Sequence, residues 1–427
     1  MLALMFSLLF LLLFTGFPLF IVLLLPSWIV AYFFFPTVSL VVIPQQMIDG
    51  IRIFSLLAVP LFIFAGSIMS RGEIADRLVK FVLTLLGHIP GGLAHTTVGS
   101  CALFGAISGS TQATVASIGK VMYPRLLKAG YRDSFSLGLI VNASNLAALI
   151  PPSIILILYG INVRASIGQL FMAGIGPGLL VAALFIAYCY VWARRSGIPL
   201  EPRSGAREIL RAAADAKWAL GMPVIILGGI YGGVFSPAET AAVSVVYAVL
   251  VEMAVYKSLS WSDVLDIAFD TASVNAVIFI LIGAGQLFSW LLTFTGFPQQ
   301  LIQFVLGLEL SRLVFLLFVN LVFFVACMFV DATAAIVVIT PLIYPIAMRF
   351  GIDPIHLGMI IGLQSTIGAG TPPFGVNIFT ACAVFKKSYF DVIRESHMFI
   401  LILVAAAVLI TVFPSLALFT HNIFYGH

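Results

Sequence analysis

The residues of this chain that could do chemistry are small and polar, and they interrupt long apolar stretches. Ser108-Gly109-Ser110-Thr111 interrupts one stretch and Asp331-Ala332-Thr333 interrupts another. Hydroxyl, carboxylate and backbone carbonyl oxygens in such interruptions can bind a small cation. Asp331 is the one acidic side chain among them, so it is either a direct cation ligand or the cap of a helix that begins near Thr333. The pattern predicts ion binding at both interruptions.

A Pro-Pro pair breaks a further apolar stretch in each half of the chain. Pro151-Pro152 lies within Asn145–Ser153, and Pro372-Pro373 lies within Gly368–Asn377. Each pair removes two amide donors and keeps the preceding residue out of helical geometry. Carbonyls one turn earlier then lose their partners and become available to a cation. We therefore expect two related cation sites, each formed by one interruption and one break, on either side of an anion site.

The candidate residues follow from this arrangement. The expected cation ligands are Ser108, Gly109, Ser110, Thr111, Asn145, Pro151, Asp331, Thr333, Gly368, Gly370, Thr371 and Pro372. The expected substrate contacts are Ser110, Asn145, Thr371 and Asn377. For any one of the polar side chains, a hydrogen bond between packed helices is the alternative role.

The composition requires these residues to work inside a membrane. Of the 427 residues, 62% are hydrophobic and 9% are charged, whereas an average soluble domain carries about 25% charged residues. This excludes a soluble fold, a disordered chain, a nucleic-acid binder and a disulfide-rich secreted scaffold. Walker A and HExxH signatures are missing from the sequence, so we expect no enzymatic activity and energy drawn from an ion gradient or from none. A channel is the option without an energy source, but broken helices at matched depth fit alternating access better than an open pore.

Membrane-spanning helices must hold the candidate residues in place. We predict spans at 2–25, 27–43, 53–70, 135–160, 169–193, 218–235, 237–256, 271–295, 355–385 and 392–419. The interrupted stretches 92–127 and 313–348 are expected to be re-entrant hairpins. With this topology, the cytoplasmic side receives all Lys and Arg residues except Arg52, Arg164, Arg312 and Arg349, in agreement with the positive-inside rule.

An internal repeat supports the two hairpins. Shifted by about 221 residues, Tyr123-Pro124 aligns with Tyr344-Pro345, and the first Pro-Pro pair aligns with the second. Residues 71–132 contain seven Lys and Arg, whereas 292–353 contain two, as expected for repeats that face opposite sides of the membrane. The predicted fold is therefore an all-α polytopic membrane protein with two inverted-topology repeats, each with a re-entrant hairpin and a broken helix.

The repeats divide the chain into four expected parts. These are N-terminal membrane helices at 1–43, a first repeat at 44–200, a cytoplasmic loop with connecting helices at 201–264, and a second repeat at 265–427. Amphipathic stretches before the hairpins, Gly72–His88 and Phe297–Arg312, are expected to lie along the membrane surface. Ser236-Pro237-Ala238-Glu239 predicts a capping box, and Glu252 is expected to be a solvated helix end near Lys257.

Four segments resemble the large membrane subunit of tripartite ATP-independent periplasmic (TRAP) transporters: LFGAISGSTQAT (103–114), PPSIILILYG (151–160), SPAETAAVSVVYA (236–248) and GAGTPPFGVNIF (368–379). The similarity extends from about residue 40 to 420. Gln112 and Gly370 depart from this family's pattern, which has other small or apolar residues at those positions.

The resemblance implies an elevator-type secondary transporter of the bacterial inner membrane. Such transporters import organic anions, typically carboxylates such as C4-dicarboxylates or sialic acids, and are driven by two or more sodium ions. A periplasmic binding protein delivers the substrate, and a small four-helix membrane subunit, expected here as a separate chain, supports the large one. The alternative is a stand-alone sodium-coupled carboxylate carrier with the same hairpin architecture.

Overall fold

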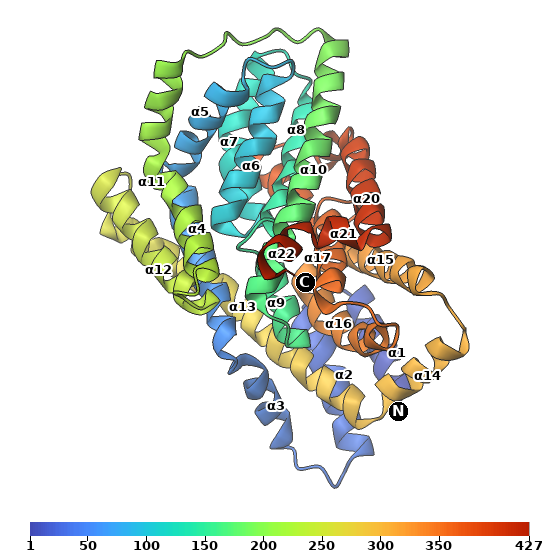
Figure 1. Ribbon diagram of the computed structural model, residues 1–427. Helices are drawn as coiled ribbons and strands as arrows, with labels where there is room; N and C mark the ends of the chain where they lie inside the picture. Colours follow the sequence, from blue (N-terminus) through green and yellow to red (C-terminus); the bar gives the residue numbers. More distant parts are fainter. Residues whose placement is uncertain (427) are drawn as a thin grey trace.

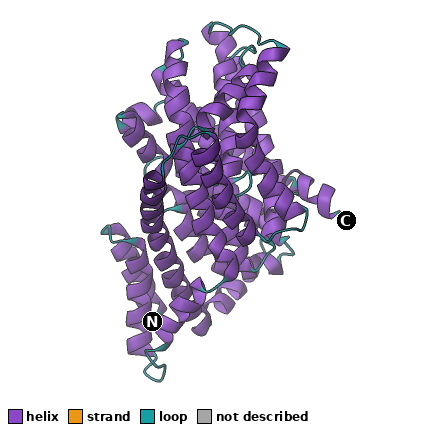
Figure 2. Cartoon of the chain, turned by 90° about the vertical axis from the view of Figure 1, so that its left-hand side faces the viewer, coloured by secondary structure: helices purple, strands orange, loops and turns teal. Residues whose placement is uncertain are grey.

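The computed structural model describes residues 1–426, which form helices joined by short loops and contain no strand (Figures 1 and 2). Seven of the helices are long and apolar enough to cross a membrane. The predicted all-helical membrane fold is confirmed.

The chain begins with a short helical hairpin. Its helices α1 (Leu2–Phe14) and α2 (Leu19–Phe34) pack on each other and are followed by α3 (Val42–Ile51). The prediction of one span over 2–25 and another over 27–43 is therefore wrong. Gly16 has a φ of +79° and Pro18 precedes α2, so the chain reverses within the apolar run. Hydrophobicity alone does not reveal such a turn.

The first repeat contains the first hairpin and the first broken helix. Its elements are a 3₁₀ turn (Phe54–Leu57), α4 (Ala58–Arg71), α5 (Ile74–Leu86), α6 (Gly92–Ser108), α7 (Thr111–Lys128), α8 (Asp133–Ala143), a second 3₁₀ turn (Ser144–Ala148), α9 (Ile154–Val163) and α10 (Ile167–Ser196). Helices α6 and α7 form the hairpin and lie beside α5 and α8 (Figure 1). Helices α8 and α9 are the two halves of the broken helix.

Connecting helices α11 (Ala206–Tyr231) and α12 (Pro237–Leu250), with a π turn at Val251–Val255, lead to the second repeat. Its elements are α13 (Trp261–Phe294), α14 (Phe297–Gly307), α15 (Arg312–Phe329), α16 (Ala332–Arg349), α17 (Pro354–Ala369), α18 (Val376–Phe385), α19 (Tyr389–Ile393), α20 (Ser396–Val412), α21 (Pro414–Ala417) and α22 (Phe419–Tyr425). Helices α15 and α16 form the second hairpin, and α17 and α18 are the halves of the second broken helix.

The residues at helix ends explain why two other predicted spans differ from the observed helices. Helix α13 begins ten residues before the predicted 271 because Ser260 and Asp263 form a capping box, in which the Ser260 amide donates to the Asp263 carboxylate at 2.7 Å. The predicted span 392–419 ends instead at Val412, because Pro414 follows. The capping box predicted at Ser236 and Glu239 is confirmed.

The prediction for Glu252 is wrong. Its side chain is fully buried and accepts hydrogen bonds from the amides of Glu73 and Ile74 at 3.1 and 3.2 Å. It therefore caps the N-terminus of α5 from the π turn that ends α12. A Cβ at Gly72 would lie 2.0 Å from the Glu252 carboxyl carbon, so this contact requires glycine.

The two broken helices are also joined at their outer ends. Lys387, just after α18, donates a 2.6 Å hydrogen bond to Asp133 at the start of α8. This bond, together with one to the Tyr123 hydroxyl, raises the pKa of Lys387. The interaction connects the first repeat to the second directly.

Candidate ion and substrate site

The first hairpin turns at a glycine that no other residue could replace easily. Gly109 has a φ of +61°, in the left-handed region, and a Cβ there would lie 2.5 Å from the carbonyl oxygen of Pro152. The tip therefore presses directly on the break between α8 and α9. Ser110 then caps α7, with its hydroxyl oxygen accepting from the Ala113 amide at 3.3 Å.

The second hairpin turns at Val330 and Asp331. Asp331 Oδ1 accepts from the Thr333 amide at 2.9 Å, so this carboxylate caps α16, which begins at Ala332. Asp331 is 221 residues after Ser110, and the two residues occupy the same N-cap position in their hairpins. The cap leaves Oδ2 of Asp331 free for a second interaction.

At each Pro-Pro break a backbone carbonyl loses its helical amide donor, and the two carbonyls differ in what replaces that donor. Both Pro-Pro peptide bonds are cis. After the first break, Ser153 donates its hydroxyl to the Ala148 carbonyl at 2.5 Å. The Ala369 carbonyl of α17 has no such partner, because Pro372 and Pro373 carry no N–H and the next amide donates to Met328.

A chain of hydrogen bonds joins the first tip to both breaks. The Thr111 hydroxyl donates to Asn377 Oδ1 at 2.8 Å, and Asn377 Nδ2 donates to Asn145 Oδ1 at 2.9 Å. The predicted residues Thr111, Asn145 and Asn377 are thus brought together from α7, the second 3₁₀ turn and α18.

Buried polar atoms without partners lie next to this chain. Asn142 Oδ1 and Asn145 Nδ2 have no hydrogen-bond partner within residues 1–426. A Cβ at Gly370 would lie 3.2 and 3.1 Å from these two atoms, so both surround that glycine. A buried amide oxygen with no donor is unusual and is a ready ligand for a cation. Asn142 was not among the predicted site residues, since nothing in its sequence surroundings distinguishes it from helix packing.

A cavity of about 400 Å³ lies between the two hairpin tips, and five of its sixteen lining residues have polar side chains; we call it the polar cavity. Its walls include equivalent positions from both repeats, 221 residues apart: Ser110 with Asp331, Gln112 with Thr333, Ala148 with Ala369, and Ile155 with Val376. Val274, Val277 and Ile278 of α13 complete one side. Equivalent positions of the two halves of the chain therefore face the same cavity.

The cavity separates the predicted site residues into two groups. Five of them line it: Gly109, Ser110, Thr111, Asp331 and Thr333. The others lie behind its wall: Ser108, Asn145, Pro151, Gly368, Gly370, Thr371, Pro372 and Asn377. Thr371 donates its hydroxyl to the Ile367 carbonyl at 2.6 Å, and a Cβ at Gly66 of α4 would lie 2.9 Å from the Ser108 backbone. Thr371 and Asn377, two predicted substrate contacts, are therefore buried between packed helices and do not line the cavity.

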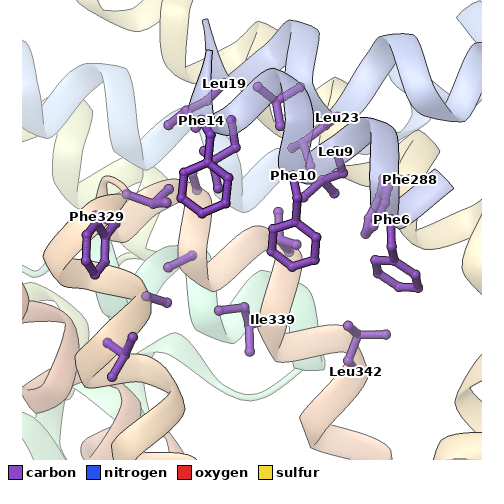
Figure 3. A pocket seen from close by; sticks show the side chains of 18 residues that line it. Phe6, Leu9, Phe10, Phe14, Leu19, Leu23, Phe288, Phe329, Ile339 and Leu342 are labelled. Carbon is purple, nitrogen blue, oxygen red and sulfur yellow. The ribbon is translucent and has the colours of Figure 1, made fainter. Parts of the chain in front are cut away.

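A second cavity, of about 420 Å³, lies on the other face of the second hairpin (Figure 3). Its walls are apolar side chains of α1, α2, α13, α15 and α16, including Phe10, Phe14 and Phe329. Because these side chains offer no hydrogen-bonding group, this cavity could not orient a polar solute. The polar cavity is the better candidate for substrate.

Comparison with known proteins agrees with this geometry. Residues 6–416 match the family model described as the tripartite ATP-independent periplasmic transporter, DctM component. The chain is 50% identical to the ectoine/5-hydroxyectoine TRAP transporter large permease protein UehC of Ruegeria pomeroyi, over 90% of this chain and 89% of that protein. It is 51% identical to the ectoine TRAP transporter large permease protein TeaC of Halomonas elongata, over 89% of each chain.

The fold also resembles that of a solved transporter. The crystal structure of the Alcanivorax borkumensis YdaH transporter matches with a TM-score of 0.59 and 14% identity, over 83% of this chain and 85% of that one. At this identity the likeness concerns the fold alone. The predictions of a transporter rather than an enzyme, and of TRAP membership, are confirmed by the family match. This chain belongs to the DctM family and is a large membrane permease component of the TRAP transporters.

Proposed function

We propose that this chain is the permease of a sodium-driven importer in the bacterial inner membrane. It would receive a small organic carboxylate from a periplasmic binding protein and work with a separate small membrane subunit. The observation that carries the proposal is the polar cavity between two hairpin tips from opposite repeats. Alternating access in transporters built from inverted repeats centres on such a site.

The substrate that fits best is a zwitterion of the ectoine type. The two relatives at 50% and 51% identity are named as ectoine transporters. Ectoine is a cyclic amidine with one carboxylate, so it carries both charges at neutral pH. The cavity is lined by no Lys, Arg or His within residues 1–426, and its one ionisable side chain is Asp331. Such a lining favours a substrate with its own positive charge over a di-anion, which refines the expected C4-dicarboxylate or sialic acid.

Sodium coupling is supported by oxygens that have no hydrogen-bond partner, one in the wall of the cavity and one buried behind it. The Asn142 Oδ1 atom beside Gly370 is one candidate ligand, and the Ala369 carbonyl is another. A positive charge moving down a potential of 100 mV yields about 2.3 kcal/mol. That amount would drive a substrate gradient of nearly two powers of ten for each net charge.

Uptake by the complete transporter in proteoliposomes tests the proposal. We expect radiolabelled ectoine to accumulate only with an inward sodium gradient and with the binding protein present. Equal uptake when potassium replaces sodium would contradict sodium coupling. Strong uptake by this chain without its partners would favour the stand-alone carrier.

A matched pair of variants tests the sodium ligand. Asn142→Leu should raise the sodium concentration for half-maximal uptake by about fivefold or more. Asn162→Leu is the control, because Asn162 Nδ2 makes the same type of bond to its own helix as Asn142 does (3.0 and 2.8 Å) but lies on α9. An unchanged sodium titration in Asn142→Leu would remove Asn142 from the ion site.

A further inference from the structure

The polar cavity contains a single nitrogen-bearing side chain. Its polar lining side chains within the described residues are Ser110, Thr111, Gln112, Asp331 and Thr333. Among these, Gln112 alone carries N–H donors. It lies on the first turn of α7.

Most of the other polar side chains are already engaged within the protein. The Ser110 hydroxyl oxygen accepts from the Ala113 amide, and the Thr111 hydroxyl donates to Asn377. One carboxylate oxygen of Asp331 accepts from the Thr333 amide. The side chain of Gln112, in contrast, is exposed and makes no hydrogen bond to residues 1–426. Its carboxamide is therefore free to bind a solute in the cavity.

The charges at the two tips determine which group of the solute lies next to Gln112. At the first tip, the positive N-terminus of α7 is capped by the neutral Ser110 and keeps its attraction for an anion. At the second tip, the Asp331 carboxylate offsets the N-terminus of α16 and repels an anion. A carboxylate in this cavity thus lies at the first tip, within reach of the Gln112 N–H groups.

We propose that Gln112 binds the substrate carboxylate and determines the preference of this permease for carboxylate-bearing solutes. The inference rests on the proposed function, in that a carboxylate must pass through the polar cavity. The substrate lies with its carboxylate against Gln112 and the rest of the molecule toward Asp331 and Thr333. Selectivity is then shared between the permease and the binding protein.

The test compares Gln112→Leu and Gln112→Glu with the wild type in the complete, reconstituted transporter. Losing a hydrogen bond to a charged group should raise the KM for ectoine about tenfold to hundredfold in Gln112→Leu. Gln112→Glu should raise it further, because it adds a second carboxylate. Sodium dependence should stay within about twofold of the wild type, since Gln112 binds the solute and not the ion.

A competition experiment gives a readout that a purely structural role would not change. The wild type should be inhibited more strongly by unlabelled ectoine than by its carboxamide analogue, which lacks the negative charge. In Gln112→Leu this preference should fall by about the same factor as KM rises. Gln300→Leu, on the exposed face of α14, is the control and should leave both values unchanged.

The outcomes separate the two proposals. A wild-type KM and a wild-type carboxylate preference in Gln112→Leu would overturn the role of Gln112. If Gln112→Leu does not fold, the same preference measured in Gln112→Asn and Gln112→Glu decides, and an unchanged preference in both overturns the role. A wild type that takes up no ectoine overturns the proposed substrate instead, and the competition is then run with the carboxylate that it does import.

Discussion

The two hairpin tips have the same architecture but different chemistry. Each ends one helix and caps the next at positions 221 residues apart, yet the caps are Ser110 in the first and Asp331 in the second. The breaks differ in the same way, because Ser153 covers the Ala148 carbonyl whereas Phe374 stands at the equivalent position and leaves the Ala369 carbonyl free. The second repeat therefore offers negative charge and a bare carbonyl, and the first offers neutral donors. A few residue differences at equivalent positions therefore give the two tips opposite electrostatic preferences.

The largest effect is expected from filling the cavity at the first tip. Ser110→Trp should abolish uptake while membrane insertion stays normal, because the side chain of Ser110 lines the cavity. Ser166→Trp is the matched control, since Ser166 also caps a helix, α10, but lies elsewhere. Normal uptake by Ser110→Trp, measured with labelled substrate, would exclude the first tip from the transport path.

Making the two tips alike should have the next largest effect. Asp331→Ser keeps an N-cap oxygen but removes the charge, so the sodium concentration for half-maximal uptake should rise about tenfold if Asp331 also binds a cation. The sodium titration of uptake measures this. An unchanged titration would reduce Asp331 to a cap of α16.

A smaller effect is expected at the first break. Ser153→Ala should lower the free energy of unfolding by about 2 kcal/mol, because the Ala148 carbonyl loses its donor in a buried environment and the Leu156 amide at the start of α9 loses its cap. Thermal unfolding in detergent measures this loss. Ser244→Ala on α12 is the control, because its partner, the Thr240 carbonyl, already accepts a helical amide. If both variants lost the same free energy of unfolding, the hydroxyl at the break would contribute no more than one within a regular helix.

The smallest effect is expected from the reverse change at the second break. Phe374→Ser would place a hydroxyl near the free Ala369 carbonyl, as Ser153 does in the first repeat. We expect sodium to activate uptake about two- to threefold more weakly, while the thermal stability in detergent is maintained or slightly raised. Stronger activation by sodium would argue against the Ala369 carbonyl as a ligand.

The hairpins and breaks could be predicted from sequence because their signals are local. Pro-Pro pairs and Ser/Gly tips act on the backbone within a few residues. The same pattern also occurs twice in the sequence, once in each repeat. The turn at Gly16 was missed because a window of apolar residues looks the same whether it runs straight or folds back. Glu252 and Asn142 were missed because their roles depend on partners far away in sequence, Ile74 and Gly370.

The hydrogen bonds from Thr111 through Asn377 to Asn145 restrict where the molecule can open. Asn145 and Asn377 are fully buried, so no water would replace a lost amide partner, and parting the first tip from the two broken helices is costly. The side of the cavity formed by Val274, Val277 and Ile278 of α13 carries no such links. The ion pair between Arg71 of α4 and Asp270 of α13 lies one turn away and is exposed to solvent. Parting the cavity on this apolar side therefore costs fewer buried hydrogen bonds than parting it at the two broken helices.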